Sequence, residues 1–293
     1  MKGVGLLFYL LCGAIFSASA ADRRLAFERN DAVHIANLEA SLVRNLAPGI
    51  FPAISTDAKS VVYTVVEKKG DTYVRRLGLI DIATGKSEIL TKIPSDNCYY
   101  GTWSPDGKWI AFTFRAEGLW NLGLIKPDGS EFRFVKKGEQ DKATLYSPCW
   151  AGDGQSIFCH DMTNIYRLRL DGSVLAQWHI RNILPNGGMS GDSRIDVSPD
   201  GKRLLLSVEM DEVYSRKDWD GPVPALWSFD LSTQRSERLT PKNLFAWDAC
   251  WLDNANVLFV SQNAGEKQPA LYRTDGKNQK RLIEDARHPT VSR

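Results

Sequence analysis

Trp103-Ser104-Pro105-Asp106-Gly107-Lys108 is a hydrophobic anchor followed by a tight polar turn, and variants of this phrase recur about every fifty residues. A clear second copy is Val197-Ser198-Pro199-Asp200-Gly201-Lys202. Proline presets the first central position of a turn, and glycine tolerates the positive φ needed after aspartate, so each copy predicts a hairpin turn. Strand-forming residues such as Trp109 to Phe114 follow these turns. One small antiparallel sheet for each repeat of this period is typical of a β-propeller.

The spacing of the anchors predicts how many sheets, or blades, the ring contains. A second strand pair follows each anchor, as in Leu226 to Leu231 and Glu237 to Thr240, which makes four strands for each repeat. No segment shows a sustained helical period, so the fold class is all-β. The anchors are Ile54, Trp103, Trp150, Val197 and Trp251, with a sixth candidate at Val291 close to the end of the chain.

Complementary strands at the two ends of the chain predict a closed ring of six blades. Three strands precede the first anchor, at Leu25 to Glu28, Val33 to Asn37 and Leu42 to Leu46, but they lack an innermost partner. The strand around Val291 would supply that partner, which closes the ring and leaves no long free edge. The alternative is a shortened chain that has lost its last blade.

The first twenty residues have the pattern of a secretory signal. Lys2 is followed by an apolar run from Val4 to Phe16, and Ser17-Ala18-Ser19-Ala20 offers a small-residue cleavage site. The run is short for a helix that spans a bilayer, and lipid attachment at Cys12 is the alternative. We therefore expect a signal peptide over residues 1–20, a single propeller domain over residues 21–293, and a periplasmic or secreted location.

Composition argues against several classes of function. There are 37 Lys and Arg residues against 35 Asp and Glu residues, and no basic stripe that would hold a nucleic acid backbone. The chain has no Cys-x-x-Cys motif of a redox or zinc site. Cysteines 149 and 250 occupy equivalent positions in non-adjacent blades, too far apart for a disulfide. We expect buried free thiols at Cys98, Cys149, Cys159 and Cys250.

The turn phrase and the pattern from Leu226 to Thr240 resemble the propeller repeats of TolB and its relatives. Similar repeats occur in the propeller domains of dipeptidyl peptidase IV-like and prolyl oligopeptidase-like enzymes. The resemblance covers essentially the whole mature chain and implies a propeller, not an activity. The TolB family places an α/β domain before its propeller, whereas here the strands begin at about Leu25. A role identical to that of TolB is therefore not implied.

Residues for catalysis are sparse. The chain has no Gly-x-Ser-x-Gly elbow of a serine hydrolase. His34, His160 and His179 fall within predicted strands, whereas His288 starts the last innermost strand and could line the axis. We expect no cofactor and no metal. The alternative is a metal-assisted carbohydrate lyase or a hydrolase, because a ring can bring distant residues together.

Binding is the better expectation, at the face where the innermost strands begin. We call this the top face; the Pro-Asp-Gly turns lie on the opposite, bottom face. Residues three and four positions before each anchor should lie at the mouth of the axial tunnel, about half of them facing solvent and the rest packed between blades. An insertion from Glu212 to Pro224 carries Trp219 and could cover the mouth, or it could be a plain surface loop. The Gly-rich segment from Asn186 to Gly191 beside it is expected to be a mobile connector.

These positions favour an exported, non-catalytic propeller whose top face binds a protein, peptide or cell-envelope ligand. Tyr, Trp and Arg are over-represented at interface hot spots, and nucleic acid is not an expected partner. The expected binding residues are Tyr99, Tyr100, Tyr146, Arg194, Trp219, Trp247, Asp248, Arg287 and His288.

Overall fold

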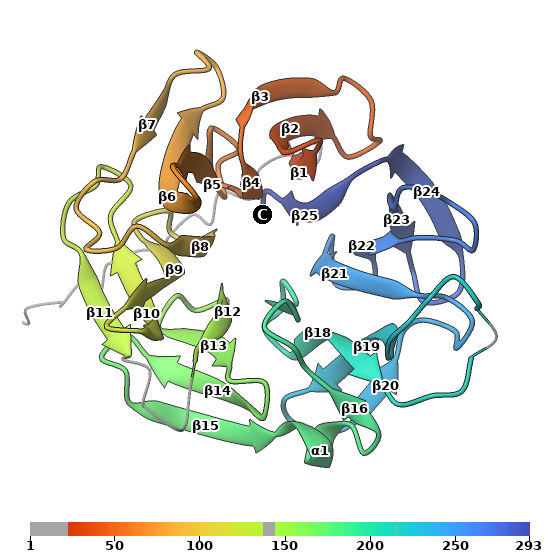
Figure 1. The fold of residues 1–293 in the computed structure, drawn as a ribbon. Coiled ribbons are helices and arrows are strands. Elements are labelled where there is room, and N and C mark those ends of the chain that lie inside the picture. The colour runs from red at the N-terminus through yellow and green to blue at the C-terminus, as the bar shows by residue number, and fades with distance from the viewer. Residues whose placement is uncertain (1–22, 137–143, 215) are drawn as a thin grey trace, which may run out of the picture.

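The computed structural model describes residues 23–136, 144–214 and 216–293, in which six sheets surround a common axis (Figure 1). The predicted all-β, six-bladed propeller is confirmed. The signal peptide predicted for residues 1–20 lies outside the described residues. Within the described ranges, no helix is long and apolar enough to cross a membrane.

Each blade is antiparallel, with its innermost strand next to the axis (Figure 1). Blades 1 and 2 consist of β4 (Ile50–Ile54), β5 (Ser60–Lys69), β6 (Thr72–Asp81) and β7 (Ser87–Ile89), then β8 (Cys98–Trp103), β9 (Ile110–Ala116), β10 (Leu119–Ile125) and β11 (Arg133–Lys136). Blade 3 consists of β12 (Tyr146–Trp150), β13 (Ser156–His160), β14 (Asn164–Arg169) and β15 (Val174–His179).

Blade 4 differs from the others because two short strands share its innermost position. Its strands are β16 (Gly187–Gly188), β17 (Ile195–Val197), β18 (Arg203–Met210), β19 (Val223–Asp230) and β20 (Ser236–Arg238). Blade 5 consists of β21 (Ala246–Trp251), β22 (Val257–Ser261), β23 (Ala270–Thr274) and β24 (Gln279–Glu284). Blade 6 consists of β25 (Arg287–Val291), β1 (Arg24–Arg29), β2 (Ala32–Asn37) and β3 (Arg44–Pro48).

The two ends of the chain share blade 6, as the sequence predicts. Strand β25 pairs antiparallel with β1, and Leu25 lies opposite Val291. The Ser292 backbone N–H donates to the carbonyl of Arg24 at 3.0 Å, which extends the pairing by one residue. Figure 1 shows β25 and β1 side by side next to the axis. The ring therefore closes through hydrogen bonds between the first and the last strand of the described residues.

The repeated turns share one hydrogen-bond pattern. In blade 2 the Ser104 hydroxyl donates to Asp106 at 2.7 Å and accepts the Trp109 backbone N–H at 2.9 Å. Gly107 has φ of 68°, as the turn requires. In the degenerate copy of blade 1, Ala58 takes the glycine position at φ 57°. The turn geometry therefore survives the loss of both proline and glycine.

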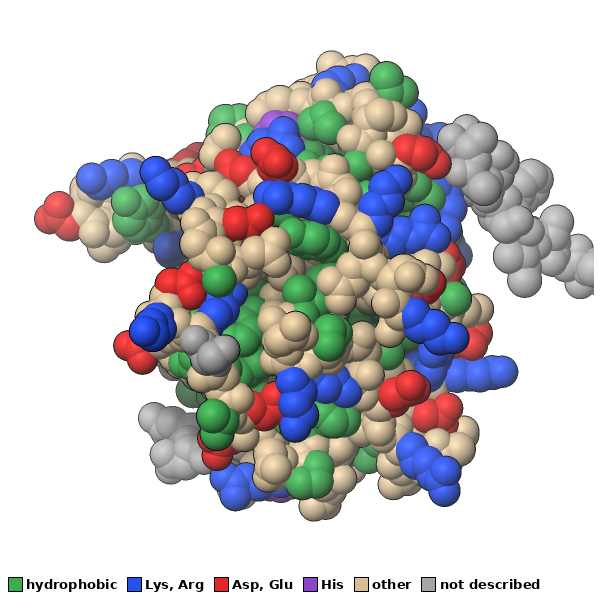
Figure 2. Space-filling model, turned by 90° about the vertical axis from the view of Figure 1, so that its right-hand side faces the viewer, with side chains coloured by type: hydrophobic (Ala, Val, Ile, Leu, Met, Phe, Trp, Pro, Cys, Tyr) green, Lys and Arg blue, Asp and Glu red, His purple; other side chains and the backbone are tan. Residues whose placement is uncertain are grey.

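Some anchors also join neighbouring blades. The indole of Trp103 donates to the carbonyl of Ala53 at 2.9 Å, and the indole of Trp150 donates to the carbonyl of Thr102 at 3.1 Å. Each bond runs from one blade to the innermost strand of the preceding blade. On the side of the molecule that Figure 2 shows, Lys and Arg side chains are interspersed with Asp and Glu side chains, as the balanced charge predicts.

Three local expectations need correction. The segment from Asn186 to Gly191 is not simply a connector, because Gly187 and Gly188 pair with Met210 and Glu209 of β18. A four-residue helix, α1 (Ile180–Ile183), precedes it and is too short to show a helical period. A count from the turn at Gly152-Asp153 predicts from the sequence that Cys149 lies opposite Ser156, and this prediction is wrong. Its partner is Phe158, because Ser156 pairs with the turn residue Ala151.

Candidate functional site

A β-bulge recurs in the innermost strands and directs one residue of each strand toward the axis. In blades 1, 2, 3 and 5 the pairing shifts register between the residues four positions and one position before the anchor, and β25 shifts similarly against β1. Bulges bend the strand and re-aim a side chain. The residue three positions before the anchor has positive φ in these five strands, at Phe51, Tyr100, Ser147, Asp248 and His288. Because the residue types differ, blade geometry and not one side chain imposes this conformation.

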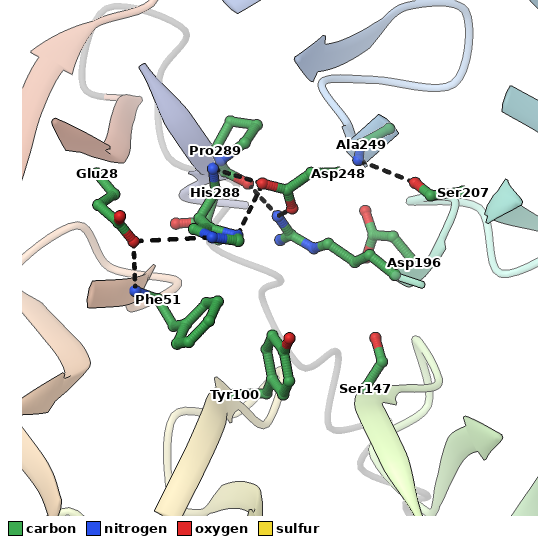
Figure 3. Close-up of polar contacts among 12 residues, drawn as sticks. Glu28, Phe51, Tyr100, Ser147, Asp196, Ser207, Asp248, Ala249, His288 and Pro289 are labelled. Atoms are coloured by element: carbon green, nitrogen blue, oxygen red, sulfur yellow. Dashed lines mark hydrogen bonds and ion pairs between the residues drawn. The ribbon is translucent and has the colours of Figure 1, made fainter. Parts of the chain in front are cut away.

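Together with Arg194 at the equivalent position of blade 4, these residues make up what we call the axial ring. Figure 3 shows Phe51, Tyr100, Ser147, Asp248 and His288 pointing toward a common centre from different blades. The four expected binding residues Tyr100, Arg194, Asp248 and His288 are therefore brought together, although up to 188 positions separate them in the sequence.

Asp248 is the electrostatic hub of the axial ring. Its carboxylate accepts the His288 backbone N–H at 2.6 Å and lies 2.7 Å from Nδ1 of the His288 ring. It also accepts a hydrogen bond from Nη1 of Arg194, at 3.2 Å. Burial alone would raise the pKa of Asp248, but His288 and Arg194 outweigh burial and hold this pKa well below its ordinary value. Blades 4, 5 and 6 are thus joined through one buried charge.

Glu28 extends the hub to blade 1. Its carboxylate accepts the Phe51 backbone N–H at 3.2 Å and lies 3.7 Å from Nε2 of His288 (Figure 3). Burial raises the pKa of Glu28, and the charge of His288 only partly offsets this effect. Glu28 is not among the binding residues expected from the sequence. Its position opposite Arg287 in the β1–β25 pairing places it there, and that register is not visible in a single sequence.

We expect Asp248 to make the fold sensitive to acid. Because its folded pKa lies below the unfolded value of about 3.9, its stabilisation is complete above that value and is lost as pH falls through the folded pKa. Glu28 acts in the opposite direction, since its raised pKa favours the protonated form in the folded state. Urea unfolding of the parent and Asp248→Asn from pH 7 to pH 3 measures the difference. The gap between the two proteins should shrink with acid, and a constant gap would contradict the assignment.

The other side of the axial ring is aromatic. The ring centroid of Phe51 lies 4.3 Å from that of His288 and 4.6 Å from that of Tyr100. The Tyr100 hydroxyl donates to Asp192 at 3.3 Å. Burial raises the pKa of Tyr100, and the negative charge of Asp192 raises it further. Tyr100 is therefore a neutral hydrogen-bond donor at the mouth.

Residues four positions before the anchors lie beside the axial ring and not in it. Tyr99 packs against Trp120, with centroids 5.4 Å apart, and its ring also contacts Phe51 of the axial ring, at 5.6 Å. Tyr146 packs against His160 at 5.7 Å. Arg287 is exposed and lines a crevice with Asp31 and other residues at the top of blade 6. Of the twelve positions at the mouth, Arg287 alone is exposed, whereas Ser147, Ser193 and Asp248 are buried.

The insertion of blade 4 packs against blade 5. Trp219 packs edge-on against Phe245 at 5.2 Å and lies 6.1 Å from Trp247. Its indole donates to the carbonyl of Pro222 at 3.0 Å, and Asp218 accepts the Gly265 backbone N–H at 3.0 Å. Contacts with Phe245, Trp247 and Gly265 therefore hold the insertion against blade 5 at the edge of the mouth. Beneath it lies a pocket of about 280 Å³ that Trp219 and Trp247 both line.

The axial channel is divided at the ring. The space among the ring residues holds only about 60 Å³. Below it, a cavity of about 440 Å³ is lined by residues of the bottom turns, such as Pro105 and Pro199, and by Asp196, Cys149 and Cys250. This cavity was not expected from the sequence. Each innermost strand contributes to this cavity the residue one position before its anchor, such as Cys149, Asp196 and Cys250. These residues are two positions after the ring residues on the same strands.

Cys98, Cys149, Cys159 and Cys250 are buried and unpaired, as expected. Burial raises the pKa of Cys250 to about 12, so its thiol is protonated at neutral pH. Among the residues that the structure describes, no group of three His, Cys, Asp or Glu side chains could hold a metal ion.

Comparison with known proteins agrees with the architecture. No family model matches the chain. Dipeptidyl-peptidase 5 of Porphyromonas gingivalis is 29% identical over 120 residues, which cover 39% of this chain and only 18% of that protein. The structure of TolB from Acinetobacter baumannii has a TM-score of 0.69 and 19% identity over 94% of this chain and 67% of that chain. Oligogalacturonate lyase from Vibrio parahaemolyticus has a TM-score of 0.56 and 16% identity, covering 87% and 75%.

The protein is a six-bladed β-propeller whose charged and aromatic side chains meet at the axis. Its fold resembles that of the TolB propellers, so the resemblance expected from the turn phrase is confirmed for the fold. Neighbours of this fold include a catalytic lyase as well as TolB, and the fold alone does not select between binding and catalysis.

Proposed function

We propose that this is an exported, non-catalytic propeller that binds a protein, peptide or cell-envelope ligand on its top face, around the mouth of the tunnel. The observation that carries the proposal is the pair Trp219 and Trp247 beside a 280 Å³ pocket at that mouth. Half-buried aromatic side chains next to a preformed pocket are typical of the hot spots of protein interfaces.

The state of the charged ring residues also favours binding over chemistry. Asp248 already accepts hydrogen bonds from three donors, and Glu28 already accepts the Phe51 backbone N–H. A general acid or base must reach the substrate directly or through one water. The 60 Å³ space at the ring is far smaller than the ~300–1,000 Å³ of small-molecule sites. The charged part of the ring, formed by Arg194, Asp248 and His288, therefore fits a structural plug below a binding surface to which Tyr100 contributes.

Binding should depend on the top face and not on the bottom face. Trp219→Ala, Tyr100→Ala or Trp247→Ala should each weaken the binding of a top-face partner by about 2 kcal/mol or more if these residues are hot spots. Lys108→Ala and Lys202→Ala, at exposed bottom turns, should cost little. The partner would be captured from an envelope extract by crosslinking to the mature chain, and its affinity measured with each purified variant.

Melting each variant in parallel separates lost binding from lost folding, because Trp247 is half-buried and its removal could also destabilise the fold. Loss of the partner in the two lysine variants with retention in the aromatic variants would place the function on the bottom face. The alternative, a metal-assisted carbohydrate lyase or a hydrolase acting at the same mouth, draws on the likeness of the fold to oligogalacturonate lyase. Metal-dependent cleavage of uronic-acid oligomers would overturn the binding proposal.

A further inference from the structure

The pocket beside Trp219 and Trp247 has an unbalanced charge. Three carboxylates line it, from Asp192 before β17, Glu209 of β18 and Asp220 of the insertion, and no lysine or arginine lines it. Among the described residues, neither Glu209 nor Asp220 has an ion pair or hydrogen-bond partner, and Asp192 accepts only the Tyr100 hydroxyl, at 3.3 Å. Three negative charges thus share one pocket in a chain whose net charge is +2.

The walls of the pocket select the kind of cation. Two indoles, of Trp219 and Trp247, line it together with Pro222 and Pro224. Indole faces attract ammonium and guanidinium groups, and aromatic cages are a recurrent device for binding organic cations. The carboxylates are too dispersed for a metal site, since no three acidic, cysteine or histidine side chains of the described part of the chain could hold one. An organic cation fits this combination.

The size and rigidity of the pocket suit a single side chain. Its 280 Å³ falls just below the ~300 Å³ at which sites for whole drug-sized molecules begin. The Trp219 indole is fixed by its hydrogen bond to the Pro222 carbonyl and by its edge contact with Phe245. Arg216 approaches the Trp219 ring at 5.6 Å, but its Nε is paired with Asp218 and it does not line the pocket. The walls are therefore in place before a ligand arrives, which lowers the entropic cost of binding.

We propose that this pocket receives a lysine or arginine side chain of the partner protein or peptide, whose charge is neutralised by Asp192, Glu209 and Asp220. The inference rests on the proposed binding function and adds the chemistry of the partner. It requires that the partner present an exposed basic residue toward the edge of the mouth, between blades 4 and 5.

The test uses the peptide acetyl-Gly-Lys-Gly-amide as the probe, titrated into the mature protein while the tryptophan indole N–H signals are followed by NMR. We expect saturable shifts with a dissociation constant of roughly millimolar strength, typical of one isolated contact. The arginine peptide should bind comparably. The peptide with norleucine, which keeps the length and loses the charge, should bind at least about tenfold more weakly.

Glu209→Gln and Asp220→Asn keep the shape of the pocket and should each weaken binding of the lysine peptide at least about threefold. High salt should also weaken binding of this peptide to the parent protein. Glu88→Gln removes the same charge from an exposed position on β7 and should change nothing. Trp219→Ala should abolish the shifts, and Trp219→Phe should restore part of them. If Trp219→Ala does not fold, the two carboxylate variants still decide the question.

Equal binding of the lysine and norleucine peptides, or unchanged binding by the double variant of Glu209 and Asp220, would overturn the inference. So would competition by calcium chloride at constant ionic strength, which would indicate a metal site, or binding of methylammonium as tight as that of the peptide. If the captured partner binds the double variant like the parent, the basic-residue inference fails and the top-face function stands. If the peptide binds but the aromatic variants capture the partner normally, the proposed function fails instead.

Discussion

Removal of residues 288–293 is expected to lower the free energy of unfolding by about 5 kcal/mol or more. The deletion removes most of β25, the innermost strand of blade 6, and with it the ladder bonds to β1. It exposes apolar side chains such as Leu25, which is only 1% exposed in the closed ring. Scanning calorimetry should record a fall in Tm of about 10–20 °C, since each kcal/mol corresponds to about 2–4 °C in a protein of this size.

Arg293→Gln is the matched control for this deletion. It removes only the ion pair between Arg293 and Asp196, and the Arg293 side chain is 33% exposed. Its cost should be about 1 kcal/mol or less. A truncated protein that melts like the parent would show that β25 contributes no stability to the ring.

Asp248→Ala is expected to cost about 3–5 kcal/mol, the typical loss when a buried ion pair is broken by removing one partner. Asp248 is only 6% exposed and is the shared counter-ion of Arg194 and His288. Without it, the Arg194 guanidinium keeps, among the described residues, only the Pro289 carbonyl as an acceptor, at 2.7 Å, and the His288 backbone N–H loses its bond to Asp248. Equilibrium unfolding in urea at pH 7 would measure the loss.

Two further variants serve as controls for Asp248→Ala. Asp248→Asn keeps an acceptor for the His288 backbone N–H and should fall between the parent and Asp248→Ala. Asp106→Ala removes a carboxylate from an exposed bottom turn and should cost no more than about 1–2 kcal/mol through its lost hydrogen bond to Ser104. If Asp248→Ala unfolds at the same urea concentration as Asp106→Ala, the charge at the axis does not hold the blades together.

The architecture was readable from the sequence because its signals are local. The Ser-Pro-Asp-Gly turns bond within four or five residues, so each copy marks a hairpin regardless of what surrounds it. The spacing of the anchors then predicts the blade count, and the unpaired strands at Leu25 and Val291 predict closure. The same counting placed Tyr100, Arg194, Asp248 and His288 at the mouth, since equivalent positions in a ring face the same axis.

The chemistry of the site was decided only by the tertiary structure. A strand pattern cannot show that a bulge turns Tyr100 and Asp248 toward the axis while Tyr99 and Trp247 turn aside, because that choice depends on pairing register. Nor can a strand pattern show that the Asp248 carboxylate already accepts hydrogen bonds from residues of the same chain. The pocket of Asp192, Glu209 and Asp220 joins a loop, a strand and an insertion whose proximity depends on how blade 4 packs on blade 5. Sequence specified the ring because turns and strand spacing are local, whereas packing between distant segments created the site.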